Sequence, residues 1–158
     1  MISNQFDITT AYLNGVLKKE VFMEVPKYTI NALERIVISE TANSYIGKIA
    51  KMLKELNKGN KVCFLKKALY GLRQDRRCWN NKINEELIKF GAKKSTADPC
   101  VYFKGGGKKL LLIAMYVDDI IVASQDKNEI AKLGEYLSNI LEVVDLEAVK
   151  YCLGMEFI

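Results

Sequence analysis

The chain has 158 residues, 49% of them hydrophobic, a formal net charge of +5 and no histidine. These values fit one globular domain. No apolar run approaches the roughly 18 residues of a membrane span, and no signal peptide is visible. We therefore expect an intracellular protein without a membrane partner. The absence of histidine excludes zinc sites with histidine ligands and nucleophilic catalysis by Ser-His or Cys-His pairs, so any chemistry must use carboxylates, lysines, tyrosines or metal ions.

The beginning of the chain predicts two strands separated by a short helical turn. Residues 2–6 have the pattern of the end of a strand, which stops at Asp7. Residues 9–15 are typical of a helical turn, with a threonine cap at its start and Gly15 at its end. Residues 20–25 alternate between polar and apolar and stop before a proline, which predicts a second strand.

The next segment differs from the rest of the chain in its density of charge. The apolar side chains of residues 30–40 and 44–56 have helical spacing. A loop of Asn, Lys and Gly follows at residues 57–60. We therefore interpret residues 27–60 as a partly helical surface insertion in one domain that spans residues 1–158.

The remainder of the chain mixes predicted strands and helices. The strands are predicted at 61–66, 99–103, 110–117, 120–123, 143–144 and 151–158, and the helices at 79–90 and 127–140. Glycines at 105–107 are expected to form a hairpin turn, since they lack the pattern of a phosphate-binding loop. This mixture predicts an α+β fold in which helices cover one face of a mainly antiparallel sheet.

Two adjacent carboxylates, Asp118 and Asp119, interrupt the apolar run at the bend between two predicted strands. A surface turn is one interpretation, because aspartate is common in turns. A metal site is the other, because hairpin turns usually combine Asp or Asn with Gly, and buried carboxylates need a cation or another partner. Residue chemistry alone leaves both interpretations open.

A third carboxylate, Asp7, also lies at the end of a predicted strand. If this strand pairs with the hairpin, Asp7, Asp118 and Asp119 converge at one edge of the sheet. Aspartates on rigid strands, without histidine, suit a hard cation such as Mg²⁺. Two such ions about 3.5–4 Å apart clamp the attacking and leaving oxygens of a phosphoryl transfer.

Six blocks of the sequence are informative when they are taken together. They are FDITTAYLNG (6–15), VFMEVP (21–26), CFLKKALYGLRQ (63–74), DPCVY (98–102), YVDD (116–119) and LGMEF (153–157). In this order they resemble the palm of reverse transcriptases from copia-like long-terminal-repeat retrotransposons, and they are distributed over nearly the whole chain apart from residues 27–60. The resemblance implies a partial reverse-transcriptase fold, a palm without complete fingers and thumb.

For the catalytic site, the resemblance implies that Asp7 and Asp118 ligate two Mg²⁺ ions, for which Mn²⁺ can substitute. Asp119 is implied as the third catalytic carboxylate, which supports the site and is a weaker ligand than the other two. The backbone carbonyl of Ile8 would face the metal ion that carries the nucleotide.

For the substrates, the resemblance implies that Tyr12 packs against the sugar and leaves no room for a 2′-hydroxyl, which favours deoxynucleotides. The alternative is that Tyr12 is a core tyrosine. The segment implied to lie under the incoming base and the template comprises Tyr70, Gly71, Arg73 and Gln74. Gly71 would allow close approach of the backbone, Arg73 would meet phosphate, and Tyr116 would pack near the primer end.

The chain also departs from the family's pattern. Asp75 and Arg76 stand where the family often has Ala-Pro, which adds charge at the start of a helix. Glu147 stands where the family usually has glycine. A turn that needs a positive φ would be strained at that position.

The implied activity is that of an RNA-directed DNA polymerase, which extends a primer with deoxynucleotides on an RNA or DNA template. The flanking integrase and ribonuclease H domains of a polyprotein would be missing, and we expect the isolated segment to have weak activity or none. The alternative is a truncated, catalytically silent retrotransposon remnant that keeps the palm fold. A two-metal nuclease would explain the three aspartates, but not Tyr12 or residues 70–74.

Overall fold

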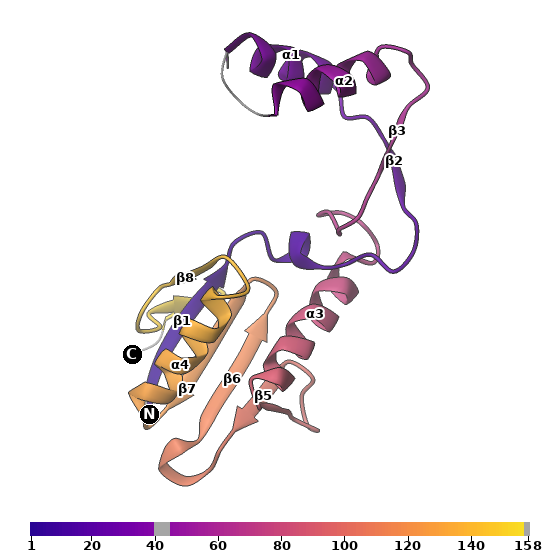
Figure 1. Cartoon of the computed structure of the whole chain (residues 1–158). Coiled ribbons are helices and arrows are strands. Elements are labelled where there is room, and N and C mark those ends of the chain that lie inside the picture. Colours follow the sequence, from indigo (N-terminus) through magenta and orange to yellow (C-terminus); the bar gives the residue numbers. More distant parts are fainter. Residues whose placement is uncertain (40–44, 157–158) are drawn as a thin grey trace. The chain divides into compact units, whose positions relative to one another are not determined.

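The computed structural model describes residues 1–39 and 45–156 (Figure 1). The chain divides into two compact units. The first, which we call the sheet unit, comprises Met1–Val16 and Lys67–Ile158. The second, which we call the hairpin unit, comprises Leu17–Lys66.

The sheet unit is built on a six-stranded sheet in which every neighbouring pair of strands is antiparallel. The strand order is β4-β5-β6-β7-β1-β8. The strands are β1 (Ile2–Ile8), β4 (Lys93–Lys94), β5 (Val101–Lys104), β6 (Leu111–Tyr116), β7 (Asp119–Ser124) and β8 (Val143–Asp145). β1 therefore lies inside the sheet, between two strands that follow it by more than a hundred residues.

Two helices, α3 (Asp75–Lys89) and α4 (Lys127–Ser138), cover one face of this sheet (Figure 1). Alternate residues of the strands point into the layer between sheet and helices, where they form the core. Among the fully buried side chains of this core are Phe6, Ile8, Ile113, Ile120 and Val122 from the strands, and Ile83, Leu87, Leu133 and Leu137 from the helices. The predicted α+β fold with helices on one face of an antiparallel sheet is thus confirmed.

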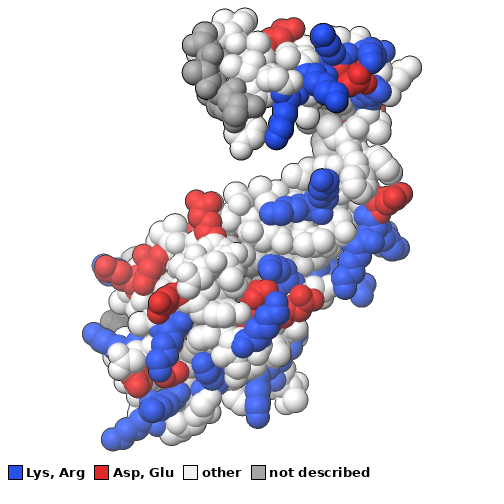
Figure 2. Space-filling model, viewed as in Figure 1, with Lys and Arg blue, Asp and Glu red and all other residues white. Residues whose placement is uncertain are grey.

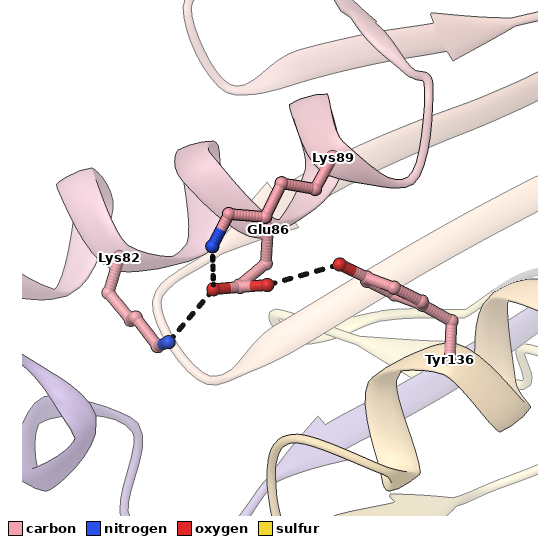
Figure 3. Close-up of polar contacts among 4 residues, drawn as sticks. All are labelled: Lys82, Glu86, Lys89 and Tyr136. Atoms are coloured by element: carbon pink, nitrogen blue, oxygen red, sulfur yellow. Dashed lines mark hydrogen bonds and ion pairs between the residues drawn. The ribbon is translucent and has the colours of Figure 1, made fainter.

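A buried carboxylate links the two helices on that face (Figure 3). Glu86 of α3 accepts hydrogen bonds from Lys82 and Lys89, both at 2.9 Å, and from the hydroxyl of Tyr136 on α4 at 3.1 Å. The two lysine hydrogen bonds lower the pKa of Glu86 from 4.5 to about 2. The network therefore keeps a charged group satisfied between the helices, where an unpaired carboxylate would be costly.

The hairpin unit consists of a two-stranded ribbon and a pair of helices. The strands β2 (Phe22–Glu24) and β3 (Val62–Phe64) pair antiparallel, and the helices α1 (Thr29–Ser39) and α2 (Ile46–Leu56) contact each other. Both predicted helices are confirmed, although residues 40 and 44 of the predicted ranges lie outside the described residues. None of the residues described in this unit is buried.

Several local predictions need correction. The turn at 9–15 is a 3-10 helix, η1 (Ala11–Asn14), and its expected threonine cap is wrong because Thr10 has a φ of +52° and makes no capping hydrogen bond. Gly15 has an ordinary φ; it is needed because a Cβ there would lie 2.9 Å from the Cβ of Cys78. α3 begins at Asp75, where the family's pattern has the start of a helix, and not at Trp79, where the apolar spacing starts.

The end of the described chain also differs from the prediction of a single strand at 151–158. It is a short hairpin of β9 (Tyr151–Cys152) and β10 (Met155–Glu156), because Leu153 and Gly154 both have positive φ and form the turn. Phe157 and Ile158 lie outside the described residues. Strand β4 and the 3-10 helix η2 (Gly107–Lys109), within the glycine-rich connection from β5 to β6, were not predicted. None of the helices in the described residues is long and apolar enough to cross a membrane.

Glu86 makes stability depend on pH in a predictable direction. Its pKa in the folded chain lies below the ordinary value of 4.5, so its contribution is complete above that pH and is lost as the pH falls toward 2. We expect Glu86→Gln to lower the free energy of unfolding at neutral pH by about 1–2 kcal/mol. The variant's free energy of unfolding should also fall less between neutral pH and pH 2 than that of the wild type, as measured by urea denaturation. Glu85→Gln, an exposed neighbour on α3, is the control; equal pH profiles for the two variants would contradict the assignment.

Glu147 has the expected positive φ, +62°, at the position where glycine is usual in the resembling family. We expect Glu147→Gly to raise the free energy of unfolding by up to about 1 kcal/mol, because glycine adopts this conformation without steric cost. The control is Glu142→Gly, at an exposed residue without a positive φ, which should lower stability. Thermal unfolding of both variants checks this, and a destabilised Glu147→Gly chain would refute the strain.

Candidate functional site

The pairing of β1 with β7 brings two of the three predicted carboxylates to the same place. Asp7 lies directly opposite Asp119 in the antiparallel register. Phe6, Ile8 and Ile120 point into the core, so the alternation of the strands puts Asp7 and Asp119 on the face that the helices do not cover. The register therefore brings these two acids together at one end of the strand pair, as the sequence predicted.

The third carboxylate, Asp118, lies in the two-residue turn between β6 and β7. The N–H of Ile8 donates a hydrogen bond of 2.8 Å to the carbonyl of Asp118, which ties the turn to β1 next to Asp7. The preceding residue, Val117, has a φ of +54°, a left-handed conformation that is strained for a β-branched side chain. Strain of this kind persists only where the surrounding structure enforces it.

Trp79 of α3 provides part of that enforcement. Its indole N–H donates a hydrogen bond of 2.8 Å to the carbonyl of Val117, and its side chain is buried. This hydrogen bond links α3 directly to the turn that carries Asp118.

The carboxylate of Asp118 has one satisfied oxygen and one unsatisfied oxygen. Oδ2 accepts a hydrogen bond of 3.4 Å from the hydroxyl of Tyr70, whereas Oδ1 is buried and has no partner among the described residues. Burial raises the pKa of this carboxyl; the Tyr70 hydrogen bond opposes that shift, and the charges of Asp7 and Asp119 add to it. A buried oxygen without a donor, beside two further carboxylates, fits the ligand chemistry of a hard cation.

The three aspartates do not form a ready three-ligand cage. Across the described residues, no group of three or more Asp, Glu, Cys or His side chains is gathered as a metal site. Asp119 is engaged elsewhere, because its Oδ1 accepts a hydrogen bond of 2.8 Å from Gln5. Sequence reasoning missed Gln5, although its position two residues before Asp7 on a strand places it on the same face. The metal-ligand roles of Asp7, Asp118 and Asp119 stay predictions.

The aromatic residues predicted to contact substrate lie near these acids. The rings of Tyr12 and Tyr70 pack with their centroids 4.6 Å apart, and Tyr70 reaches Asp118 as described. Tyr12 is buried, as the core interpretation expected, but it also lines an open cavity of about 440 Å³. The residues that line this cavity include Tyr12, Arg76, Arg77, Trp79, Tyr116 and Val117. Tyr12 and Tyr116 are thus brought to one cavity beside the carboxylates.

The loop before α3 is held by Asp75, one of the residues that depart from the family's pattern. Asp75 is buried, and its carboxylate accepts a hydrogen bond of 3.1 Å from the N–H of Gly71 and another from the N–H of Arg76. Gly71 has a φ of +95° and open space around its Cα, so the turn needs glycine for its conformation rather than for close approach. Asp75 therefore acts as an internal clamp of the loop, which its charge alone did not indicate.

Two other residues of this loop are not joined to the acids. Within the described part of the chain, no hydrogen bond or ion pair links the side chain of Arg73 or Gln74 to Asp7, Asp118 or Asp119. Arg73 is exposed and Gln74 is half-buried at the residue before α3. Their predicted contacts with a base and a template concern molecules outside the chain and stay predictions.

Comparison with known proteins gives a consistent picture. Residues 45–158 match the family described as reverse transcriptase (RNA-dependent DNA polymerase). A retrovirus-related Pol polyprotein from transposon TNT 1-94 of Nicotiana tabacum is 32% identical over 98% of this chain, and one from transposon RE1 of Arabidopsis thaliana is 30% identical over 96%. A putative transposon Ty5-1 protein of Saccharomyces cerevisiae is 26% identical over 94% of the chain and 41% of its own length. The chain spans only 10% and 9% of the length of the first two relatives.

The hydrogen bond from Trp79 to Val117 leads to a test of the turn. We expect Trp79→Phe to keep most of the packing, to lower the free energy of unfolding by about 1–2 kcal/mol, and to speed hydrogen exchange at the amide of Ile8, which is bonded to the same turn. Exchange measured by NMR reports the turn separately from global stability.

The control for this variant is Tyr102→Phe, which removes another buried hydrogen bond, from Tyr102 to Asn84, without touching the turn. It should lower stability while leaving exchange at Ile8 to follow global unfolding alone. If the two variants speed hydrogen exchange at the Ile8 amide equally for a given loss of stability, Trp79 does not hold the turn.

Proposed function

The chain belongs to the reverse transcriptase (RNA-dependent DNA polymerase) family, and on that premise we propose that the Asp7–Asp118 edge of its sheet carries out nucleotidyl transfer. In this reaction the 3′-hydroxyl of a primer attacks the α-phosphate of a deoxynucleoside triphosphate, and pyrophosphate leaves. The observation that carries the proposal is the buried, unpartnered Oδ1 of Asp118 beside Asp7. An oxygen in this state is suited to a cation ligand.

Asp7 and Asp118 would hold two Mg²⁺ ions, with Mn²⁺ as a substitute. When bound, these ions would neutralise charge on the phosphates and orient the attacking and leaving oxygens. The residues of this chain fix the geometry: the Ile8 amide and Trp79 hold the turn, and Gln5 orients Asp119 as a supporting carboxylate. The carbonyl of Ile8 would face the nucleotide. Positioning of this kind supplies much of the rate in phosphoryl transfer.

The substrates would contact residues around the same edge. The ring of Tyr12 would lie under the sugar and exclude a 2′-hydroxyl, with its position supported by the ring of Tyr70. The loop formed by Tyr70, Gly71, Arg73 and Gln74 would lie under the incoming base and an RNA or DNA template. Tyr116, directly opposite Asp119 in the β6–β7 hairpin, would contact the primer end.

A catalytically silent remnant that keeps the palm fold is the second candidate. The strained Glu147, at a position where the resembling family has glycine, supports it. The two candidates differ in their metal chemistry and in activity. A remnant would fold without extending a primer, even when it is joined to the segments that flank the family's palm.

Removal of either central carboxylate tests the metal assignment. We expect Asp118→Asn and Asp7→Asn to weaken Mn²⁺ binding to the chain by on the order of tenfold or more, because each removes a charged oxygen ligand. Isothermal titration calorimetry and Mn²⁺ electron paramagnetic resonance measure this on the isolated chain. The control is Glu135→Gln on α4, which removes the same charge from the helix that covers the other face. Equal binding by Asp118→Asn and Glu135→Gln would reject the assignment.

Activity is tested by grafting residues 1–158 in place of the matching segment of the tobacco TNT 1-94 polyprotein, which aligns over 98% of the chain. We expect primer extension on an RNA template that depends on Mg²⁺ and is lost in the Asp7→Asn and Asp118→Asn grafts. The isolated chain should extend little or not at all. A graft that folds and binds metal without extending a primer would favour the silent remnant.

Tyr12 is expected to set the choice of sugar in the active graft. Tyr12→Val should reduce the preference for deoxynucleotides over ribonucleotides by on the order of tenfold or more, because the smaller side chain leaves space for a 2′-hydroxyl. Tyr12→Phe keeps the ring and should keep the preference. The ratio of kcat/KM values for the two nucleotides is the measurement, and an unchanged ratio in Tyr12→Val would remove the steric role.

A further inference from the structure

The net positive charge of the chain comes from one of its two units. The hairpin unit, Leu17–Lys66, has ten lysines and arginines against five glutamates, whereas the sheet unit has fourteen basic and fourteen acidic residues. All of the net charge of +5 therefore belongs to fifty residues. In Figure 2 several basic side chains, in blue, lie on the helices of this unit with few acidic ones, in red, whereas both colours are spread over the sheet unit.

Helix α2 separates an apolar side from a basic side. Ile46, Ile49, Leu53 and Leu56 are half-buried on the side that packs with α1, while Lys48, Lys51 and Lys54 are exposed. These three lysines, which we call the lysine row, are three residues apart. At the pitch of an α-helix they follow each other by about 4.5 Å along the axis and stay within about a third of its circumference.

Within the described part of the hairpin unit, acidic side chains do not neutralise the lysine row. Glu55, the one glutamate of α2, is paired with Lys58 at 2.5 Å and Lys61 at 3.5 Å, and the hydrogen bond from Lys58 lowers its pKa. No ion pair joins Lys51 or Lys54 to a carboxylate among the described residues, and Lys48 lies over the ring of Tyr45, 5.4 Å from its centroid. Three ammonium groups are therefore available to an external anion.

The ribbon of the same unit displays aromatic side chains. Phe22 and Phe64 lie directly opposite each other on β2 and β3, with ring centroids 5.3 Å apart, and are 56% and 51% exposed. Two adjacent exposed rings offer a flat apolar surface on which another aromatic group can stack. Aromatic surfaces combined with a row of cations are the combination that proteins use to bind single-stranded nucleic acids, by stacking on bases and pairing with phosphates.

We propose that the hairpin unit binds a single strand of nucleic acid, with Lys48, Lys51 and Lys54 on its phosphates and the Phe22–Phe64 pair on its bases. The proposal adds a strand-binding surface outside the carboxylate edge, and only the choice of a nucleic acid over another polyanion rests on the proposed function. Complementarity of charge selects a polyanion, and the exposed ring pair selects one with stackable bases. RNA and DNA share this chemistry, so both are included in the test.

The test measures binding of the full 158-residue chain to a fluorescent 20-nucleotide oligouridine by anisotropy, in EDTA, over a series of salt concentrations. The triple variant Lys48→Gln, Lys51→Gln, Lys54→Gln is compared with Lys93→Gln, Lys108→Gln, Lys109→Gln. The control removes the same charge from exposed lysines of the sheet unit that have no ion pair among the described residues. Because all six side chains are exposed, both variants should fold, as checked by circular dichroism.

The salt dependence of binding is the slope of the logarithm of the binding constant against the logarithm of the salt concentration. Three phosphate contacts by the lysine row should contribute about 2 to this slope, since each contact on a single strand contributes about 0.7. Between 50 and 200 mM salt, the wild-type chain should therefore lose about twentyfold more affinity than the lysine-row variant. The control should keep the wild-type slope. Equal slopes in the two triple variants would show attraction by net charge alone and would overturn the proposal.

Further ligands decide the class of partner. The double variant Phe22→Leu, Phe64→Leu should bind oligouridine and single-stranded DNA about tenfold more weakly, because it loses base stacking. Its affinity for an RNA–DNA duplex should not change. Tighter binding of the duplex, or a lysine-row effect found only with vesicles containing phosphatidylserine, would reject a single strand as the partner. Binding in EDTA needs no metal, so the two proposals fail separately. If the chain binds oligouridine while its graft does not extend a primer, the catalytic proposal is refuted and this one is kept.

Discussion

The pairing of β1 with β7 is the constraint on which the carboxylate edge depends. Six residue pairs, from Ile2 opposite Ser124 to Asp7 opposite Asp119, fix the register. The register is enforced from the other face, where Phe6, Ile8, Ile120 and Val122 are buried under the helices. A slip by one residue would turn these side chains out to solvent and bury Asp7 in the core. The hydrophobic core and the acidic edge are therefore two results of one alignment.

The turn at Val117 and Asp118 shows how stability elsewhere supports an unfavourable arrangement. A valine in the left-handed region and a carboxylate oxygen without a donor both cost free energy. Backbone and side-chain hydrogen bonds from Ile8 and Trp79 hold the turn in place nevertheless. Such a site is already organised before a ligand arrives, so binding energy is not spent on ordering it.

Local patterns in the sequence were sufficient for the fold class. The meeting of Asp7 with the hairpin was predicted only on the condition that the two strands pair, because alternation and strand ends give the face and the edge that a residue occupies but not the neighbour of its strand. The strain at Glu147 was also predictable, from the glycine that the resembling family has there. The roles of Gln5, Trp79 and Asp75 were not, since each depends on a contact across the fold: Gln5 with Asp119, Trp79 with Val117, and Asp75 with the loop at Gly71. The strands β4, β9 and β10 have two residues each, which is too short to show an alternation of polar and apolar residues in the sequence.

The interior position of β1 has a consequence for how the protein is made. The ribosome releases this strand before its neighbours β7 and β8, which end at Ser124 and Asp145. At roughly 5–20 residues per second, the nascent strand waits on the order of ten seconds with both edges unpaired. During that interval the segment ISNQFDI is open to chaperones and to other nascent chains. Slower translation between β1 and β8 lengthens the time for which this strand is exposed.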